Sequence, residues 1–199
     1  MRRQRPSLNL TECFERLAAD VCARVLALAH INPRRVLFCL TRARRTSLGG
    51  TYAKIMPMRF PDGSPLKAVE GGMYALPQIP TVEGDILYLI YIYLPRFYQQ
   101  PFERRVLTVI HELFHIAPAF DGTIRRIGTR AHGASRVQFN AQLTPLVDAY
   151  LQSDPPEEVL AFLRGDFTAL ASQSQLTGRA LALPKAVKLG AAQVVPVLD

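Results

Sequence analysis

The sequence has few cysteines and no long hydrophobic segment. Cys13, Cys22 and Cys39 are an odd number and lack the C-x-x-C spacing of a zinc ribbon or redox site, so we expect buried free thiols in a reducing cytoplasm. The longest apolar run, Ile86 to Leu94, contains three tyrosines. Because it has about half the length of a membrane-spanning helix, it predicts a buried strand and no membrane association.

The chain also lacks internal repeats, low-complexity segments and an evident export signal. Its start, Met1 to Arg5, is charged like a signal peptide, but Glu12 and Glu15 interrupt the apolar region that a signal peptide needs next. With 199 residues, of which 49% are hydrophobic, the chain can bury one core of ordinary size. We therefore expect a single domain over residues 1–172 and a loosely docked tail over residues 173–199.

The charge balance is strongly basic. The formal net charge is +8 and the pI is near 9.8, which permits contact with DNA or with acidic proteins. The arginines occur as scattered pairs without a base-reading motif, and this favours a generally solvated basic surface. DNA is therefore a candidate partner that the composition allows without identifying it.

Histidine is scarce, and its distribution is uneven. The chain has four histidines, and three of them, His111, His115 and His132, fall within one short window. His111 to His115 reads H-E-x-x-H. Two histidines four residues apart lie on one face of a helix, where both imidazole nitrogens can reach one metal ion.

The segment around this motif has helical periodicity. Pro101 suits a first helical turn, and Pro118 disfavours helix at the residue before it, so the helix should end just after His115. The spacing predicts two faces: an apolar one with Phe102, Val106, Val109, Ile110, Leu113 and Ala117, and another shared by Arg104, Thr108, His111 and His115.

Glu112 lies beside the two histidines without belonging to the ligand pair. A carboxylate in that position can take a proton from water that the metal activates, which is the arrangement of a zinc hydrolase. We therefore predict a zinc metalloprotease that hydrolyses peptide bonds of a protein or peptide substrate, with Zn²⁺ as cofactor and Glu112 as general base. Arg126, Arg130, Arg136 and Tyr150 are candidate donors to the developing negative charge.

A function of another class is a non-catalytic module for DNA binding or interaction that zinc stabilises. Structural zinc sites are usually closed by four protein ligands and rely on cysteine. All three cysteines lie far upstream of the histidines, which favours an open catalytic site.

Periodicity and turn residues predict the secondary structure. Asn9 with Glu12 resembles a helix N-cap, and His30 falls at the end of that helix, near Ala29, where the helix dipole favours a cation. The remaining expectations are strands at Val36 to Leu40, at Tyr52 to Phe60 with Pro57 at an edge or bulge, at Met73 to Ile79 and at Ile86 to Tyr93, and helices from about Ala134 and over Val159 to Ser172. Either of the strands at Tyr52 and Ile86 can form the rim that pairs with an extended substrate.

The residues resemble a known family. Leu94-Pro95-Arg96-Phe97, the H-E-x-x-H helix, Phe120-Asp121-Gly122, Arg125-Arg126 and His132-Gly133 are similar to phage-type metallopeptidases and, more distantly, to the SprT and Spartan zincins. The resemblance covers about residues 34–151. It implies an α+β fold with a short, mostly antiparallel sheet over the active-site helix, and zinc bound by His111, His115 and His132. Spartan-type proteins act on DNA-attached proteins, although this chain lacks their cysteine zinc ribbon.

The third ligand remains open between His132 and Asp121. Asp121 stands where metzincins place a third ligand, but Pro118 replaces the glycine of their sharp turn and no methionine follows for a Met-turn. Zinc also prefers nitrogen where histidine is present, which favours His132. Asp121 would otherwise accept a hydrogen bond that orients a ligand imidazole.

Overall fold

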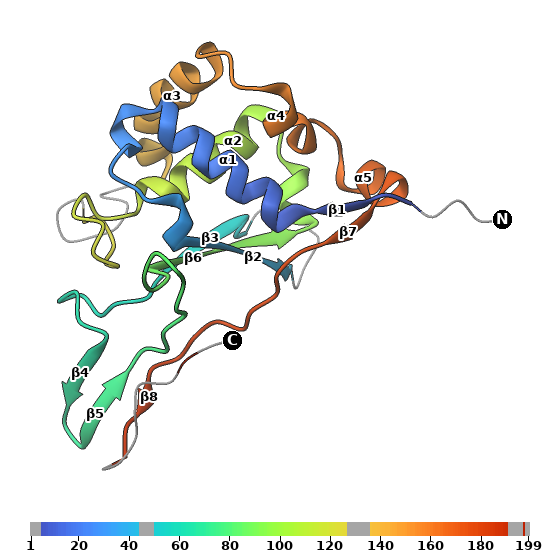
Figure 1. The fold of residues 1–199 in the computed structure, drawn as a ribbon. Coiled ribbons are helices and arrows are strands. Elements are labelled where there is room, and N and C mark those ends of the chain that lie inside the picture. Colours follow the sequence, from blue (N-terminus) through green and yellow to red (C-terminus); the bar gives the residue numbers. More distant parts are fainter. Residues whose placement is uncertain (1–4, 44–49, 127–135, 191–196, 198–199) are drawn as a thin grey trace.

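The computed structural model of the chain describes residues 5–43, 50–126, 136–190 and 197 (Figure 1). The helices are α1 (Leu10–Arg24), α2 (Phe102–Phe114), α3 (Arg136–Gln152), α4 (Glu157–Arg164) and α5 (Phe167–Gln173), with 3₁₀ turns η1 (Leu26–Leu28), η2 (Pro33–Arg35) and η3 (Arg96–Gln99). The strands are β1 (Ser7–Asn9), β2 (Val36–Arg42), β3 (Ala53–Pro57), β4 (Leu66–Val69), β5 (Gly72–Ala75), β6 (Tyr88–Leu94), β7 (Gln175–Thr177) and β8 (Val187–Lys188). This mixture confirms the α+β class. None of the helices in these ranges has the length and apolar character needed to cross a membrane.

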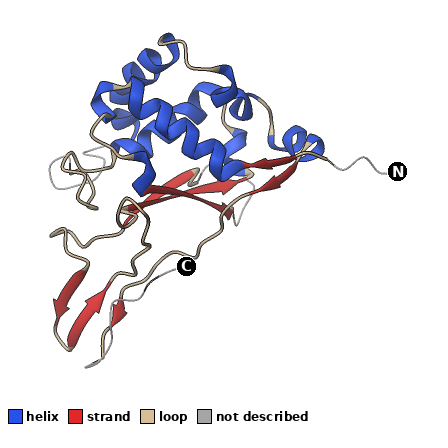
Figure 2. Cartoon of the chain, viewed as in Figure 1, coloured by secondary structure: helices blue, strands red, loops and turns tan. Residues whose placement is uncertain are grey.

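The central sheet has the strand order β2-β6-β3 (Figure 2). Side chains of β6 are buried from Tyr88 to Ile92, as expected for an apolar strand covered on both faces. β6 is parallel to β2 and antiparallel to β3. The central sheet is therefore mixed and not mostly antiparallel as expected. The chain passes through β3, β4 and β5 between β2 and β6, and β6 then runs in the same direction as β2.

β3 is the edge strand of the central sheet, and it lies next to α2. In the described sheet it bonds to β6 alone, and Pro57 stands at its end, where the missing N–H interrupts no ladder. Tyr93 N donates to Tyr52 O (2.9 Å), so Tyr52 and every second residue after it direct their backbone N–H and C=O groups toward β6. Ile55, three residues on, therefore turns its N–H to the opposite side. The edge role predicted from Pro57 is confirmed.

The main core lies between the sheet and the helices, which cover the same face of it (Figure 1). Phe14 of α1 is fully buried there. Its ring stacks on Phe38 of β2 at 5.7 Å between centroids, and it meets Phe97 of η3 at 5.2 Å and Phe162 of α4 at 4.9 Å edge to face. One aromatic side chain thus joins four elements that are far apart in the sequence.

The opposite face of the sheet is covered by the C-terminal segment. Leu40 N bonds to Arg179 O (2.7 Å), and the Tyr91 hydroxyl donates to Ala182 O (3.1 Å). β7 is parallel to β1, and β8 pairs with β5. The described part of the tail therefore contacts β1, β2, β5 and β6.

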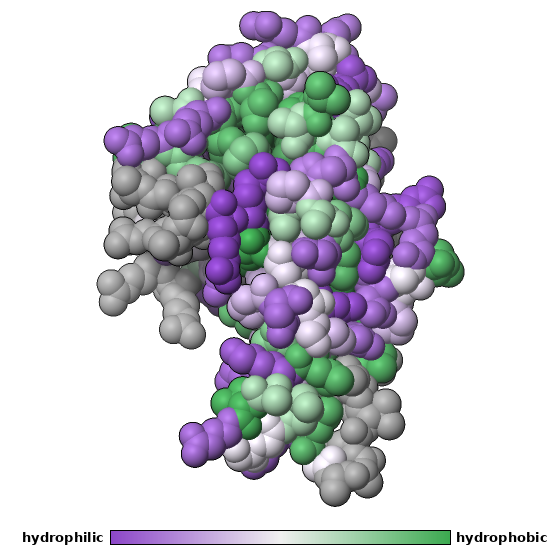
Figure 3. Space-filling view, turned by 90° about the vertical axis from the view of Figure 1, so that its left-hand side faces the viewer, coloured by the Kyte–Doolittle hydropathy of each residue, from purple (hydrophilic) through white to green (hydrophobic). Residues whose placement is uncertain are grey.

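A second small sheet, β4-β5-β8, projects away from the helices (Figure 1). Its strands carry exposed apolar side chains, and the space-filling view shows apolar residues on this projection among polar ones (Figure 3). The exposed apolar side chains include Val69 (49% exposed), Met73 (42% exposed) and Val187 (44% exposed).

Two expected helices differ from the structure. Asn9 caps α1 as predicted, since its side chain accepts from Glu12 N (3.4 Å), but the helix ends at Arg24 and η1 replaces its last turn. His30 therefore does not cap a helix. Burial, together with Arg125, lowers the pKa of His30, which disfavours the cation expected there. The helix expected over Val159 to Ser172 is divided into α4 and α5 at Gly165, and Asp166 caps α5 through Ala169 N (2.7 Å).

The three cysteines are buried free thiols, as predicted. Burial raises the pKa of Cys22 to about 12 and that of Cys39 to about 11. The thiols of Cys22 and Cys39 are therefore protonated at neutral pH and pack as apolar side chains.

Arg105 joins the first turns of α2 to the elements packed beside them. The residue is 6% exposed, and its guanidinium donates to the carbonyl oxygens of Gln100, Leu163, Gly165 and Tyr98. Burial lowers the pKa of this guanidinium, but the carbonyl dipoles satisfy its donors. One side chain thus ties α2 to η3 and to the junction of α4 and α5.

Replacing Arg105 with lysine should lower the free energy of unfolding by about 2–3 kcal/mol, because an ammonium cannot reach all four carbonyls. Urea denaturation of both forms measures the change. Arg104→Lys is the matched control, since the neighbouring side chain is exposed and its replacement should change stability by less than about 0.5 kcal/mol. Equal effects of the two substitutions would contradict the anchoring role.

Candidate metal centre and adjoining cavity

The helix α2 begins and ends as its prolines predict. Pro101 is the N-cap residue, and His115 is the C-cap residue three positions before Pro118. Four of its apolar side chains are fully buried: Val106, Val109, Ile110 and Leu113. This burial holds the opposite face, with the histidines, toward β3 and α3.

His111 and His115 converge at the end of α2. Their Nε2 atoms are 3.0 Å apart, and their rings are nearly perpendicular, with an interplanar angle of 78°. Both side chains are buried, at 7% and 4% exposure. The spacing predicted from the H-E-x-x-H pattern therefore brings two imidazole nitrogens to one point.

Asn140 of α3 fixes the ring of His111. Its Oδ1 atom lies 2.7 Å from Nδ1 of His111. With the carboxamide oxygen as acceptor, His111 donates its Nδ1 proton and keeps the lone pair on Nε2, the atom that faces His115. The sequence alone gives no signal for Asn140, because the pairing depends on how α3 packs against α2.

Phe139, the preceding residue of α3, covers both imidazoles. Its ring is parallel to that of His115, with centroids 5.2 Å apart and an interplanar angle of 8°. It meets His111 edge to face at 4.9 Å. The sequence predicted a helix from about Ala134, but not the contact of Phe139 with the histidines.

Glu112 points toward the edge strand. Its Oε2 atom accepts a hydrogen bond from Ile55 N (2.8 Å), and the residue is 7% exposed. The donor is the N–H of β3 that faces away from β6. The carboxylate is therefore held next to the histidine pair and at the outer edge of the described sheet.

The paired imidazoles fit a divalent zinc ion. Two nitrogens that bind one tetrahedral zinc at about 2.0–2.1 Å are separated by roughly 3.3 Å, close to the observed 3.0 Å. Among the described residues, no group of three or more His, Cys, Asp or Glu side chains is placed to hold a metal ion. His132, the favoured third ligand, lies outside the described residues.

Asp121, the alternative ligand, is directed elsewhere. Its Oδ1 atom accepts from Thr123 N (3.0 Å) and from the Thr123 hydroxyl (2.7 Å), and the residue is exposed. The structure does not bring this carboxylate together with the histidine pair. Asn140 occupies the orienting role considered for Asp121.

The candidate donors to developing charge are only partly described. Tyr150 is fully buried and donates to Asp20 of α1 (2.8 Å), and it therefore joins α1 to α3 away from the histidines. Arg126 is exposed. Arg130 and the side chain of Arg136 lie outside the described part of the chain.

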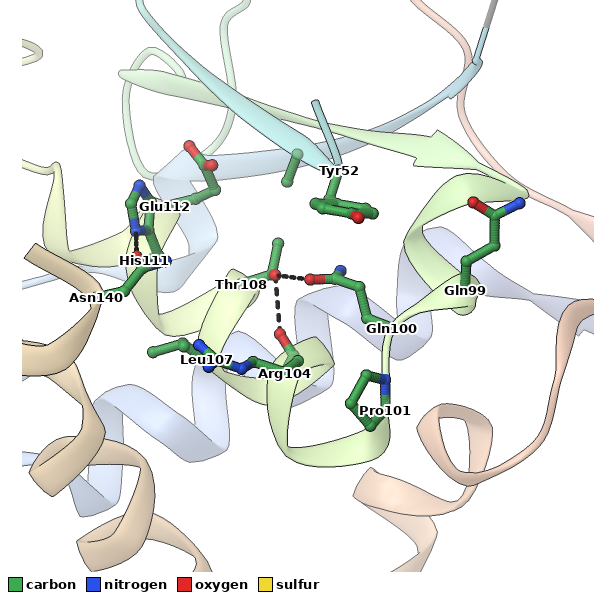
Figure 4. Close-up of a pocket in the computed structure, with 11 residues that line it drawn as sticks. Tyr52, Gln99, Gln100, Pro101, Arg104, Leu107, Thr108, His111, Glu112 and Asn140 are labelled. Atoms are coloured by element: carbon green, nitrogen blue, oxygen red, sulfur yellow. Dashed lines mark hydrogen bonds between the residues drawn. The ribbon is translucent and has the colours of Figure 1, made fainter. Parts of the chain in front are cut away.

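A cavity of about 380 Å³ opens beside the site (Figure 4). Its walls come from the start of β3, from the connection between η3 and α2, from the histidine-bearing face of α2 and from α3. They include Tyr52, Gln100, Arg104, Thr108, His111 and Glu112. The helix face with Arg104 and Thr108 was predicted from the sequence, but the cavity was not.

Replacing Asn140 with leucine should weaken zinc binding about 10- to 100-fold, because His111 loses the acceptor that fixes its tautomer. Competition with a chromophoric chelator measures the affinity. Gln142→Leu, at an exposed position of the same helix, is the control and should leave the affinity unchanged. Equal affinities of the two variants would remove Asn140 from the site.

No protein-family model, curated protein or solved structure matches this chain.

Proposed function

We propose that this protein is a zinc-dependent peptidase. The observation that carries the proposal is the convergence of the His111 and His115 Nε2 atoms at 3.0 Å, next to a buried carboxylate at the edge strand of the described sheet. A nitrogen pair with an adjacent base is the arrangement of a zinc hydrolase. The resemblance of the H-E-x-x-H segment to phage-type metallopeptidases supports the same interpretation.

His111, His115 and His132 would hold the ion. The described residues on both sides of His132 support its inclusion: Arg125 N bonds to His115 O (2.7 Å) before the undescribed residues 127–135, and Asn140 contacts His111 after them. The chain therefore leaves and rejoins the described structure beside the two histidines. A third imidazole also completes the donor set that leaves one position open in catalytic sites.

Glu112 would act as the general base. When bound, zinc would polarise the peptide carbonyl and lower the pKa of water in the site. Glu112 takes the proton of the attacking water and passes it to the departing amine. Its bond to Ile55 N keeps the carboxylate turned to the sheet edge, where an extended substrate would lie.

The free edge of β3 would hold the substrate. Backbone hydrogen bonds to an edge strand bind an extended chain without demanding a particular sequence. β6 was the other candidate for this rim, but it lies in the middle of the sheet, so β3 is the strand that supports the proposal.

The free cysteines bear on the compartment of the protein, and its net charge bears on the candidate substrates. Three buried free thiols support a cytoplasmic location, since a reducing compartment keeps them unpaired. The net charge of +8 keeps proteins bound to DNA among the candidate substrates. Assays with unfolded protein substrate, with and without DNA, separate a general peptidase from one that DNA stimulates.

Glu112→Gln should retain zinc and lose hydrolysis by about a hundredfold or more, because an amide cannot accept the water proton. The assay is cleavage of an unfolded protein by zinc-loaded enzyme. Glu103→Gln, at an exposed position on the same helix, should cleave like the unsubstituted protein. Activity of Glu112→Gln within about tenfold of that control would exclude Glu112 as base.

His132→Ala should weaken zinc binding severely, because two imidazoles remain, whereas Asp121→Ala should leave the affinity nearly unchanged. Calorimetric titration of both variants gives the comparison. The reverse order would replace His132 by Asp121 in the ligand set. Tight zinc binding by the unsubstituted chain without any hydrolysis would instead favour the non-catalytic module.

A further inference from the structure

The cavity beside the histidines extends along α2 toward its first turns (Figure 4). Arg104, Thr108 and His111 lie on successive turns of the same helix face. Arg104 is therefore two turns, or about 11 Å, from His111 along the helix. The cavity thus has a catalytic end, at His111 and Glu112, and a distal end, at Arg104.

Arg104 is the cationic side chain of this distal end. It is exposed, and it forms no salt bridge with an acidic side chain in the described structure, in contrast to Arg164 on α4, which pairs with Glu157 at 2.8 Å. A guanidinium offers a planar set of donors that matches a carboxylate. The distal end therefore presents donors that can bind a carboxylate.

The wall next to Arg104 is polar and held in place. The Thr108 hydroxyl lies 3.0 Å from Gln100 Oε1 and 2.8 Å from Arg104 O, and Gln100 Nε2 donates to Phe97 O (3.3 Å). The ring of Tyr52 faces this wall across the cavity (Figure 4). On this side of the cavity, these groups offer hydrogen bonds to a polar occupant.

The catalytic end and the distal end offer different groups to a substrate. The Glu112 carboxylate is turned toward β3 and away from Arg104 (Figure 4). A carboxylate at the distal end would therefore meet the Arg104 cation without facing the Glu112 carboxylate.

We propose that this cavity is a specificity subsite for an acidic side chain, glutamate or aspartate, of the polypeptide substrate, and that Arg104 binds its carboxylate. The inference rests on the proposed peptidase function, which places the scissile bond at His111 and Glu112. An extended chain advances about 3.3 Å per residue, so the selected side chain lies within about three residues of that bond. The net charge of +8 would also attract acidic substrates.

The test compares peptides that differ only in Glu, Gln or Lys at each position around a cleavage site. For zinc-loaded unsubstituted protein, kcat/KM should be about tenfold higher with Glu than with Gln at one position, and the preference should shrink in about 0.5 M salt. Arg104→Gln should abolish the preference, and Arg104→Glu should reverse it toward Lys. Lys185→Glu, an equal charge change at an exposed position of the C-terminal segment, should leave it intact.

A binding measurement separates this inference from the proposed function. Fluorescence anisotropy of the same peptides with Glu112→Gln reports affinity without turnover. Cleavage without acidic preference, or a preference that both Arg104 variants retain, overturns the subsite and leaves the peptidase standing. Arg104-dependent binding of Glu peptides without cleavage by the unsubstituted protein supports the subsite and overturns the peptidase. If the unsubstituted protein does not cleave the peptides and shows no preference for Glu peptides, both the subsite and the peptidase function are overturned.

Discussion

The four-residue spacing of His111 and His115 is the constraint on which the site depends. On a helix this spacing can bring two Nε2 atoms to 3.0 Å only if both rings turn to the same side. Asn140 and Phe139 of α3 hold the rings in that orientation, and Arg105 ties the first turns of the helix to η3 and to the junction of α4 and α5. The packing of α2 thus determines the chemistry that the two imidazoles can perform.

The edge strand β3 serves the sheet and the site together. One side of its backbone completes the central sheet with β6, and the other side places the Ile55 N–H on Glu112. A strand in the middle of the sheet has no free N–H to give, so the edge position couples the fold to the orientation of the proposed base. The same edge borders the cavity whose distal end carries Arg104, and it would therefore align both the scissile bond and the neighbouring side chain.

Local patterns predicted the features that depend on neighbours in sequence. The N-cap at Asn9, the end of α2 before Pro118, the edge strand at Pro57 and the buried strand at β6 all reflect backbone preferences or periodicity. Three features depend on residues far apart in the chain: the parallel pairing of β2 with β6, the contact of Asn140 with His111 and the hydrogen bond of Tyr150 to Asp20. No local preference encodes those partners, because long-range packing chooses them.

X-ray absorption at the zinc edge of the zinc-loaded protein tests the central claim, that the α2 histidines form an open zinc site. We expect one ion per chain with three imidazole nitrogens at about 2.0–2.1 Å and no sulfur ligand. We also expect that His111→Ala and His115→Ala each abolish stoichiometric binding. A sulfur shell near about 2.3 Å, four imidazole ligands, or zinc retained by both variants would contradict the claim.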